Sequence, residues 1–188
     1  MHIKKTNAIL GLLSILFLIL HIGYTVYAYL SFYYNPFLKL VFAIPFMVCT
    51  CLHAVCGMLI VFTQSDGTRM DLYTKLNMQT VLQRVTAALI FPLLILHINT
   101  FSLMKASAEN GQIIFIFLLI LAELLFFAVV ITHVSVSLTK SLITLGILES
   151  RKTQQALDRI IYVIGAIIYA VSVFAIVKVQ LAMFLAGN

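Results

Sequence analysis

Five long apolar segments occupy most of this chain and decide what it can fold into. They run at about residues 8–30, 37–62, 81–104, 113–138 and 157–185. Each is long enough to cross ~30 Å of hydrocarbon at ~1.5 Å rise per residue, and too long and continuous for a buried strand. The alternating polarity of a membrane β-barrel strand is absent. We therefore expect residues 1–188 to form a single transmembrane domain, an all-α bundle of five helices.

The composition and the charges support this class and predict an orientation. Hydrophobic residues make up 63% of the chain and charged residues 10%, which excludes an ordinary water-soluble domain. Nine of the twelve basic residues fall on the side that holds the N-terminus and the second and fourth connections: Lys4, Lys5, Arg69, Lys75, Arg84, Lys140, Arg151, Lys152 and Arg159. The positive-inside rule then places the N-terminus in the cytoplasm and the C-terminus outside. The net charge of +6 needs no nucleic-acid partner, because topology and anionic lipids account for it. We expect a multi-pass protein of a bacterial cytoplasmic membrane.

Four histidines, one in each of the first four segments, are the most regular ionisable feature of the chain. They are His21, His53, His97 and His133. Polar side chains in lipid are costly and tend to be functional. A single membrane histidine is more often a hydrogen-bond partner between helices than a metal ligand. Four in this arrangement would each need a separate polar partner, so we favour axial ligation of haem iron.

The depths of these histidines predict how they pair. Counted from the cytoplasmic edge, His21 and His97 both lie about 20 Å into the membrane. His53 and His133 lie at roughly 13 Å and 10 Å. We call His21 and His97 the outer pair, and His53 and His133 the inner pair. The pattern predicts two bis-histidine haems b stacked across the membrane.

Polar residues near the cytoplasmic edge could support these cofactors. Helical spacing places Gln83 and Thr86 on the face of His97, and Ser137 and Lys140 on the side of His133. Together with Arg84 they are candidate partners of the anionic haem propionates. For Lys140 and Arg84, snorkelling of the side chain to the headgroups is an equal alternative.

The segments around these histidines resemble a known family. Cys51-Leu-His53-Ala-Val-Cys-Gly57 and Leu82-Gln-Arg-Val-Thr86 followed by His97, with Phe17-Leu-Ile-Leu-His21 and Thr132-His133-Val-Ser, look like the five-helix dihaem cytochrome b anchor of succinate:quinone oxidoreductases. That family comprises succinate dehydrogenases and quinol:fumarate reductases. The resemblance covers essentially the whole chain in length, helix count and ligand order. Ala87 departs from the glycine that relatives often carry after the Gln-Arg-Val-Thr run.

The resemblance implies a function. Such anchors pass electrons between a membrane quinone, here expected to be menaquinone, and an iron–sulfur subunit that connects to a flavoprotein. His53 and His133 would hold the proximal haem, and His21 and His97 the distal one. Both soluble subunits would dock on the cytoplasmic face, and the flavin and dicarboxylate sites would lie on them. The direction of the reaction, succinate oxidation or fumarate reduction, stays open.

Glu123 is the one carboxylate deep inside a membrane segment. An acid there is by default a candidate functional residue, and its level matches the outer pair. We expect it to carry protons to or from a quinone beside the distal haem. A neutral glutamic acid bonded to a neighbouring helix is an equally good interpretation.

Two other functions remain open from the sequence. A dihaem anchor of a different quinone-linked reductase would share this chemistry and differ only in its soluble partner. A non-redox membrane transporter would use the histidines to line a cavity. The three cysteines, Cys49, Cys51 and Cys56, match neither covalent haem attachment nor a zinc site, and we expect them to be small buried residues.

Overall fold

The computed structural model describes residues 2–63 and 74–184, and all five expected helices are present in it. They are α1 (His2–Ser31), α2 (Pro36–Thr63), α3 (Thr74–Glu109), α4 (Ile113–Thr144) and α5 (Arg151–Phe184). Every one of them is long and apolar enough to cross a membrane. The prediction of an all-α, five-helix membrane bundle is confirmed at that level.

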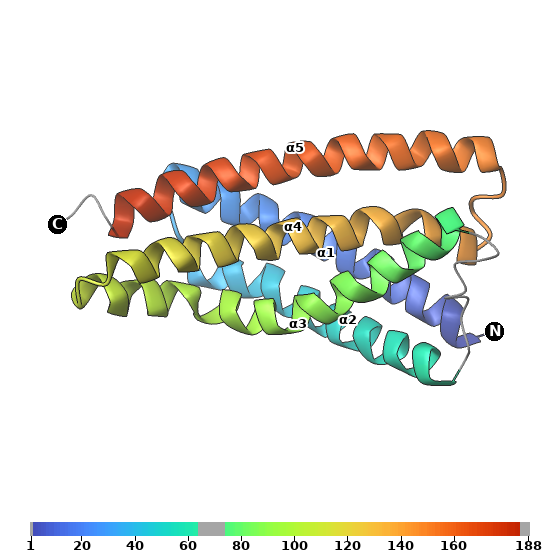
Figure 1. Cartoon of the computed structure of the whole chain (residues 1–188), viewed down its shortest axis with the longest axis horizontal. Helices are drawn as coiled ribbons and strands as arrows, with labels where there is room; N and C mark the ends of the chain where they lie inside the picture. Colours follow the sequence, from blue (N-terminus) through green and yellow to red (C-terminus); the bar gives the residue numbers. More distant parts are fainter. Residues whose placement is uncertain (1, 64–73, 185–188) are drawn as a thin grey trace.

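Two antiparallel hairpins and a fifth helix form the bundle. Helix α1 packs along α2, and α3 packs along α4, whereas α5 lies against α4 and α1. Figure 1 shows the hairpins side by side with α5 along one flank. The chain runs along the bundle five times, an odd number, so its described ends at His2 and Phe184 lie at opposite ends of the bundle. We call the end with His2, Thr63 and Thr144 the N-side, and the other end the C-side.

The helices extend beyond the apolar segments, and the predicted connections are correspondingly too long. Helix α3 begins at Thr74 and continues to Glu109, and α4 continues to Thr144. The reason is that polar residues flanking a hydrocarbon-spanning helix still satisfy their backbone groups best by continuing its hydrogen bonds. The second connection is described only in part, since Asp66, Arg69 and Asp71 fall outside the described residues.

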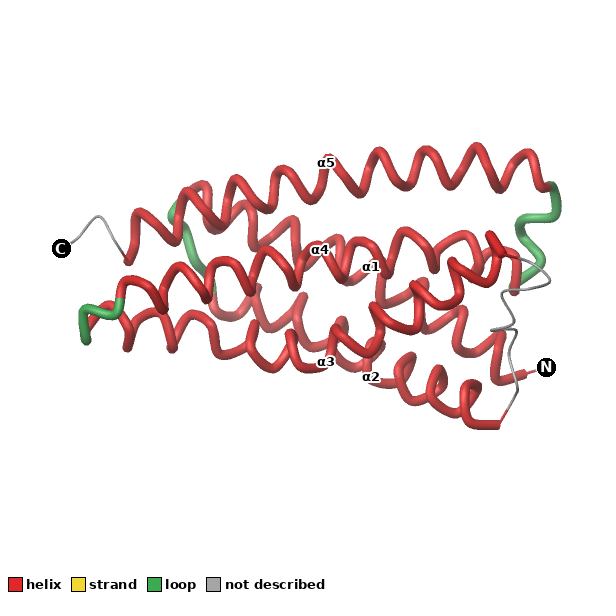
Figure 2. The backbone as a smooth tube through the Cα atoms, in the orientation of Figure 1, coloured by secondary structure: helices red, strands yellow, loops and turns green. Residues whose placement is uncertain are grey.

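Short turns close the C-side of both hairpins, as Figure 2 shows in green. Between α1 and α2 the Tyr24 hydroxyl donates to the Asn35 carbonyl oxygen at 2.7 Å. The Asn35 side chain in turn accepts from the backbone N–H of Phe37 at 3.0 Å and so caps α2. Between α3 and α4 the chain turns at Gly111 with φ of 67°, a left-handed conformation that favours glycine.

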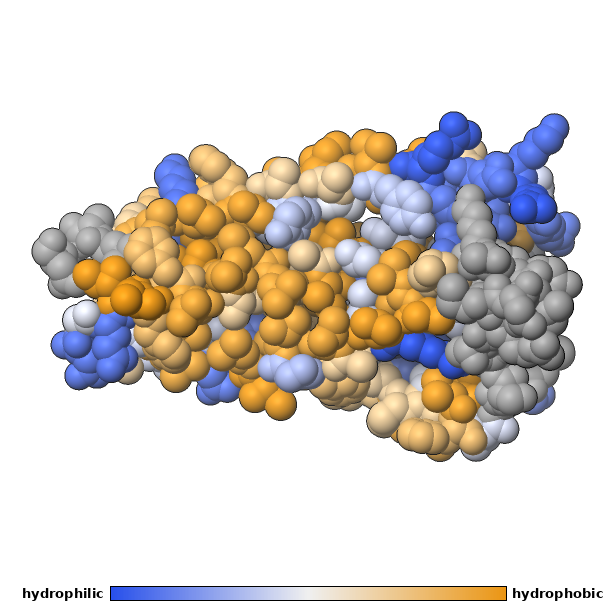
Figure 3. All heavy atoms as spheres, in the orientation of Figure 1, coloured by the Kyte–Doolittle hydropathy of each residue, from blue (hydrophilic) through white to orange (hydrophobic). Residues whose placement is uncertain are grey.

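The surface is hydrophobic between polar ends. Figure 3 shows apolar residues over the middle of the bundle and hydrophilic residues gathered toward its ends. Helix α2 exposes a long apolar series that includes Leu40, Ile44 and Leu52. In water such a surface would be unfavourable, whereas against lipid it is the expected exterior. Cys51 lies on this exposed surface, and Cys49 and Cys56 are half-buried, so the expectation that all three cysteines are buried is wrong.

Candidate functional site

The four histidines are contributed by four different helices, and the structure brings them together in twos. His21 on α1 and His97 on α3 are close enough to interact electrostatically, as are His53 on α2 and His133 on α4. Each hairpin therefore supplies one histidine to each pair. In the described chain, α1 does not pack closely along α3, and α2 does not pack closely along α4. The two members of a pair thus come from helices that face each other across the bundle.

His53 is held by the helix that precedes its own. Its Nδ1 lies 2.9 Å from the backbone carbonyl oxygen of Asn7 on α1. The imidazole lies directly on Gly11, where a Cβ atom would be 3.0 Å from His53 Cε1. A glycine here allows the ring to reach the backbone of α1, because any larger residue would meet the ring.

His133 is held by two acceptors on α3. Its Nδ1 lies 3.1 Å from the Gln83 carbonyl oxygen and 3.1 Å from Thr86 Oγ1. The Thr86 hydroxyl donates its own hydrogen to the Leu82 carbonyl at 2.7 Å, so its oxygen is free to accept from the imidazole. Gln83 and Thr86, predicted for the face of His97, therefore serve His133. The reason is that they lie well toward the N-side, at the level of the inner pair.

Lys140 adds positive charge near this inner level. It reaches from α4 to α3, where Nζ donates to Thr80 Oγ1 at 2.9 Å and to Gln83 Oε1 at 3.3 Å. Lys140 and Gln83 therefore lie together, and their shared role at the haem propionates stays a prediction. Arg84 follows Gln83 on α3 and is half-buried. Ser137 is buried on α4, one turn after His133, and its hydroxyl has no hydrogen-bond partner within residues 2–63 and 74–184.

His97 is held by α4. Its Nδ1 lies 2.8 Å from Glu123 Oε2, and the Glu123 side chain is only 5% exposed. The ring stacks on Phe126, with centroids 4.7 Å apart, and meets the edge of Phe127 at 6.0 Å. Glu123 is therefore hydrogen-bonded to a neighbouring helix, whatever its protonation state. The proton-transfer role stays a prediction.

His21 has the fewest partners of the four. Its ring stacks on Phe46 of α2 with centroids 5.8 Å apart, and its buried Nδ1 has no hydrogen-bond partner among the described residues. The outer pair is thus asymmetric, with one imidazole bonded to a carboxylate and the other unpaired at the same atom.

The remaining ring nitrogen, Nε2, is accessible in all four histidines. Within the described chain none of the four Nε2 atoms makes a hydrogen bond, and none is fully enclosed. A backbone carbonyl can only accept, so Nδ1 of His53 and of His133 must carry the hydrogen. In neutral imidazole, Nε2 then carries a lone pair, which is the form that binds metal.

The donor set fits a haem better than a free metal ion. No group of three or more His, Cys, Asp or Glu side chains that could hold a metal occurs in residues 2–63 and 74–184. A metal bound by two imidazoles needs its other donors from a cofactor, and a porphyrin supplies four. Among the described residues, four buried polar atoms on the helices that carry the histidines also lack partners: Asn7 Oδ1, His21 Nδ1, Thr50 Oγ1 and Ser137 Oγ.

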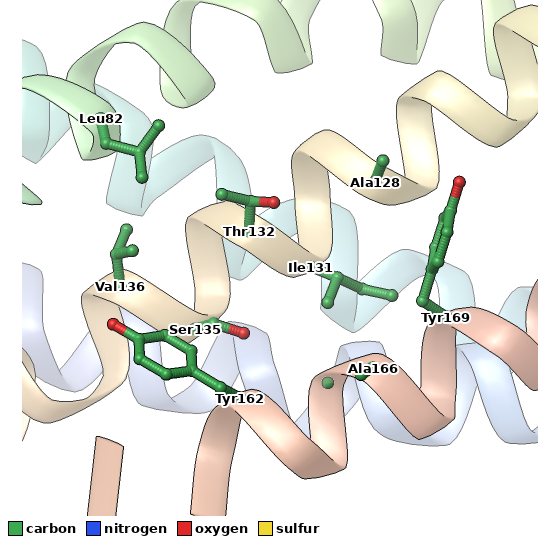
Figure 4. A pocket seen from close by; sticks show the side chains of 10 residues that line it. Leu82, Ala128, Ile131, Thr132, Ser135, Val136, Tyr162, Ala166 and Tyr169 are labelled. Atoms are coloured by element: carbon green, nitrogen blue, oxygen red, sulfur yellow. The ribbon is translucent and has the colours of Figure 1, made fainter. Parts of the chain in front are cut away.

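A separate pocket of about 430 Å³ lies between α4 and α5. Figure 4 shows Tyr162 and Tyr169 of α5 at its two ends and Thr132 and Ser135 of α4 along its wall. Thr132 precedes His133, so the pocket is at the level of the inner pair but on another face of α4. Its lining is mostly apolar, which suits a lipid chain or another membrane-soluble molecule.

Sequence reasoning missed five partners of the histidines: Asn7, Gly11, Phe46, Phe126 and Phe127. The acceptor at Asn7 is a backbone atom and has no sequence signature. Depth alone would not have found Gly11, since it lies about 5 Å into the first segment whereas His53 lies about 13 Å into the second. Comparisons with protein-family models, with curated proteins and with solved structures give no match to this chain.

Proposed function

We propose that this chain is the dihaem cytochrome b subunit that anchors a succinate dehydrogenase or fumarate reductase complex to the membrane. In this role it transfers electrons between a membrane quinone, with menaquinone expected, and an iron–sulfur subunit. The observation that carries the proposal is the state of the four imidazoles. Three have Nδ1 against an oxygen acceptor, all four have an accessible Nε2, and they approach one another in two pairs.

This arrangement matches the chemistry of metal-binding histidines. Such a histidine almost always gives its second ring N–H to a carboxylate, a carbonyl or water, which fixes its tautomer and orientation. His21 and His97 would hold one haem, and His53 and His133 the other. When bound, haem supplies reversible one-electron transfer at a potential set by its ligands and surroundings. Lys140, Gln83, Thr86, Arg84 and Ser137 would face the propionates at the N-side.

The partners follow from the shape of the bundle. The described connections are short turns, and a soluble catalytic module has no room in them. The flavoprotein and the iron–sulfur subunit would dock at the N-side, where mixed charges such as Arg151, Lys152 and Asp158 gather. The positive-inside rule supports a cytoplasmic position for this side. The quinone would react at the level of the outer pair, where Glu123 is the candidate for proton transfer.

A reduced-minus-oxidised visible spectrum of the purified complex tests the proposal. We expect a b-type band and a haem-to-chain ratio near two, which falls by one in His53→Ala and in His21→Ala. Absence of the band would eliminate both dihaem functions and leave the transporter alternative. Copurifying flavin and iron–sulfur subunits would distinguish the succinate or fumarate complex from an anchor of another quinone-linked reductase.

A further inference from the structure

Glu123 is the only buried acid in the described part of the chain, and its carboxyl group is hydrogen-bonded to His97. Its side chain is 5% exposed, and Oε2 lies 2.8 Å from His97 Nδ1. An unpaired carboxylate in a membrane interior is strongly unfavourable. The contact with His97 gives the buried carboxyl group a polar partner, and it also restricts rotation of the imidazole ring.

The same helix fixes the His97 ring on two further sides. Phe126 and Phe127 follow Glu123 by three and four residues, so all three side chains project from one face of α4. Phe126 stacks on the ring at 4.7 Å and an interplanar angle of 24°, and Phe127 meets it edge-on. Rotation of the ring about its Cβ–Cγ bond would break the carboxylate contact and the stacking together.

We propose that Glu123 is a positioning residue, which holds the His97 imidazole with Nε2 presented toward its partner His21 and which makes it a more basic ligand. The inference rests on the proposed function. The other paired histidines, His53 and His133, give Nδ1–H to neutral acceptors. A carboxylate accepts more strongly than a carbonyl and adds negative charge next to the ligand. Such a ligand stabilises ferric over ferrous iron, so Glu123 lowers the midpoint potential of the outer haem.

Three variants of the intact complex test this role. Glu123→Gln keeps the size of the side chain and an acceptor oxygen but removes the charge. Glu123→Leu removes the acceptor as well. Thr100→Val is the matched control, because Thr100 is 3% exposed, lies one turn after His97 and bonds only its own helix, at Leu96.

The readouts are a redox titration that resolves the two haems and their low-temperature electron paramagnetic resonance spectra, with His21→Ala identifying the outer signal. We expect Glu123→Gln to raise the outer midpoint potential and to move the outer resonance, while the inner haem and the Thr100→Val complex match the wild type. Glu123→Leu should also weaken retention of the outer haem by about tenfold or more. If Glu123→Leu fails to accumulate, Glu123→Gln decides alone.

Two different results would contradict the positioning role and the proposed function separately. An unchanged outer haem in Glu123→Gln, or equal shifts in both haems, would overturn the positioning role and leave the dihaem function intact. A wild-type complex without b-type haem would instead overturn the proposed function itself.

Discussion

Thr86 Oγ1 of α3 lies 3.1 Å from Nδ1 of His133 on α4. The two residues are 47 positions apart in the sequence, and the contact joins the helices of the second hairpin at the level of the inner pair. The Gln83 carbonyl oxygen lies at the same distance from this nitrogen. The imidazole therefore shares one hydrogen between two acceptors, and only one of them depends on a side chain.

Thr86→Val tests that shared hydrogen bond. Valine matches threonine in size, and the Gln83 carbonyl remains, so the bundle should fold with a loss of about 0.5–1.5 kcal/mol in the free energy of unfolding. We expect a small change in the inner-haem resonance and none in the outer one. A change confined to the outer haem would contradict the assignment of Thr86 to His133.

Gly11→Ala tests the close approach of His53 to α1. The new Cβ would lie 3.0 Å from Cε1 and 3.2 Å from Nδ1 of the imidazole, so the ring must move. Overpacking of this kind costs about 1–3 kcal/mol. The inner haem should be lost or spectrally altered while the outer haem remains, as measured by haem content and difference spectra.

Gly23→Ala is the matched control on the same helix, since a Cβ there has no neighbour within 4 Å. This variant should retain two haems. If Gly11→Ala and Gly23→Ala affected haem content equally, the effect would come from the added methyl group in α1 and not from contact with His53.

Double replacements test the pairing itself. His53→Ala with His133→Ala removes both ligands of one pair, so one haem per chain should remain. His53→Ala with His21→Ala removes one ligand from each pair, so the haem count should approach zero. Pyridine haemochrome assays of the purified complexes measure both ratios, and equal counts would refute the pairing.

Asp158→Ala tests the attachment of α5. The Thr139 hydroxyl, buried on α4, donates to Asp158 Oδ1 on α5 at 2.7 Å. Loss of the acceptor leaves a buried donor unsatisfied, at a cost of about 1–3 kcal/mol. We expect a lower unfolding temperature with both haems still bound. Asp158→Asn keeps an acceptor and should be milder; haem loss in either variant would show that α5 also shapes the cofactor sites.

The number of helices was predictable from the sequence because lipid permits few alternatives to a long apolar helix. Helical rise converts residue number into depth, and on that ground the sequence predicts His21 with His97 and His53 with His133, the same partners that interact electrostatically in the structure. The depths themselves stay a prediction.

The azimuth of each side chain was not predictable. Gln83 and Thr86 contact His133 because they lie at its level on the neighbouring helix, although helical spacing puts them on the face of His97. The contact between Glu123 and His97 depends on how α3 and α4 are rotated against each other, which the packing of both helices determines.

Each hairpin carries one histidine of the outer pair and one of the inner pair. During biosynthesis, α1 and α2 would enter the bilayer with one histidine of each pair. The outer pair would be completed only by α3 and the inner pair only by α4. Under the proposed function, each haem iron would link a histidine of the first hairpin to a histidine of the second, one at each level. Haem binding would then be completed late in membrane assembly, after helices of both hairpins have been inserted.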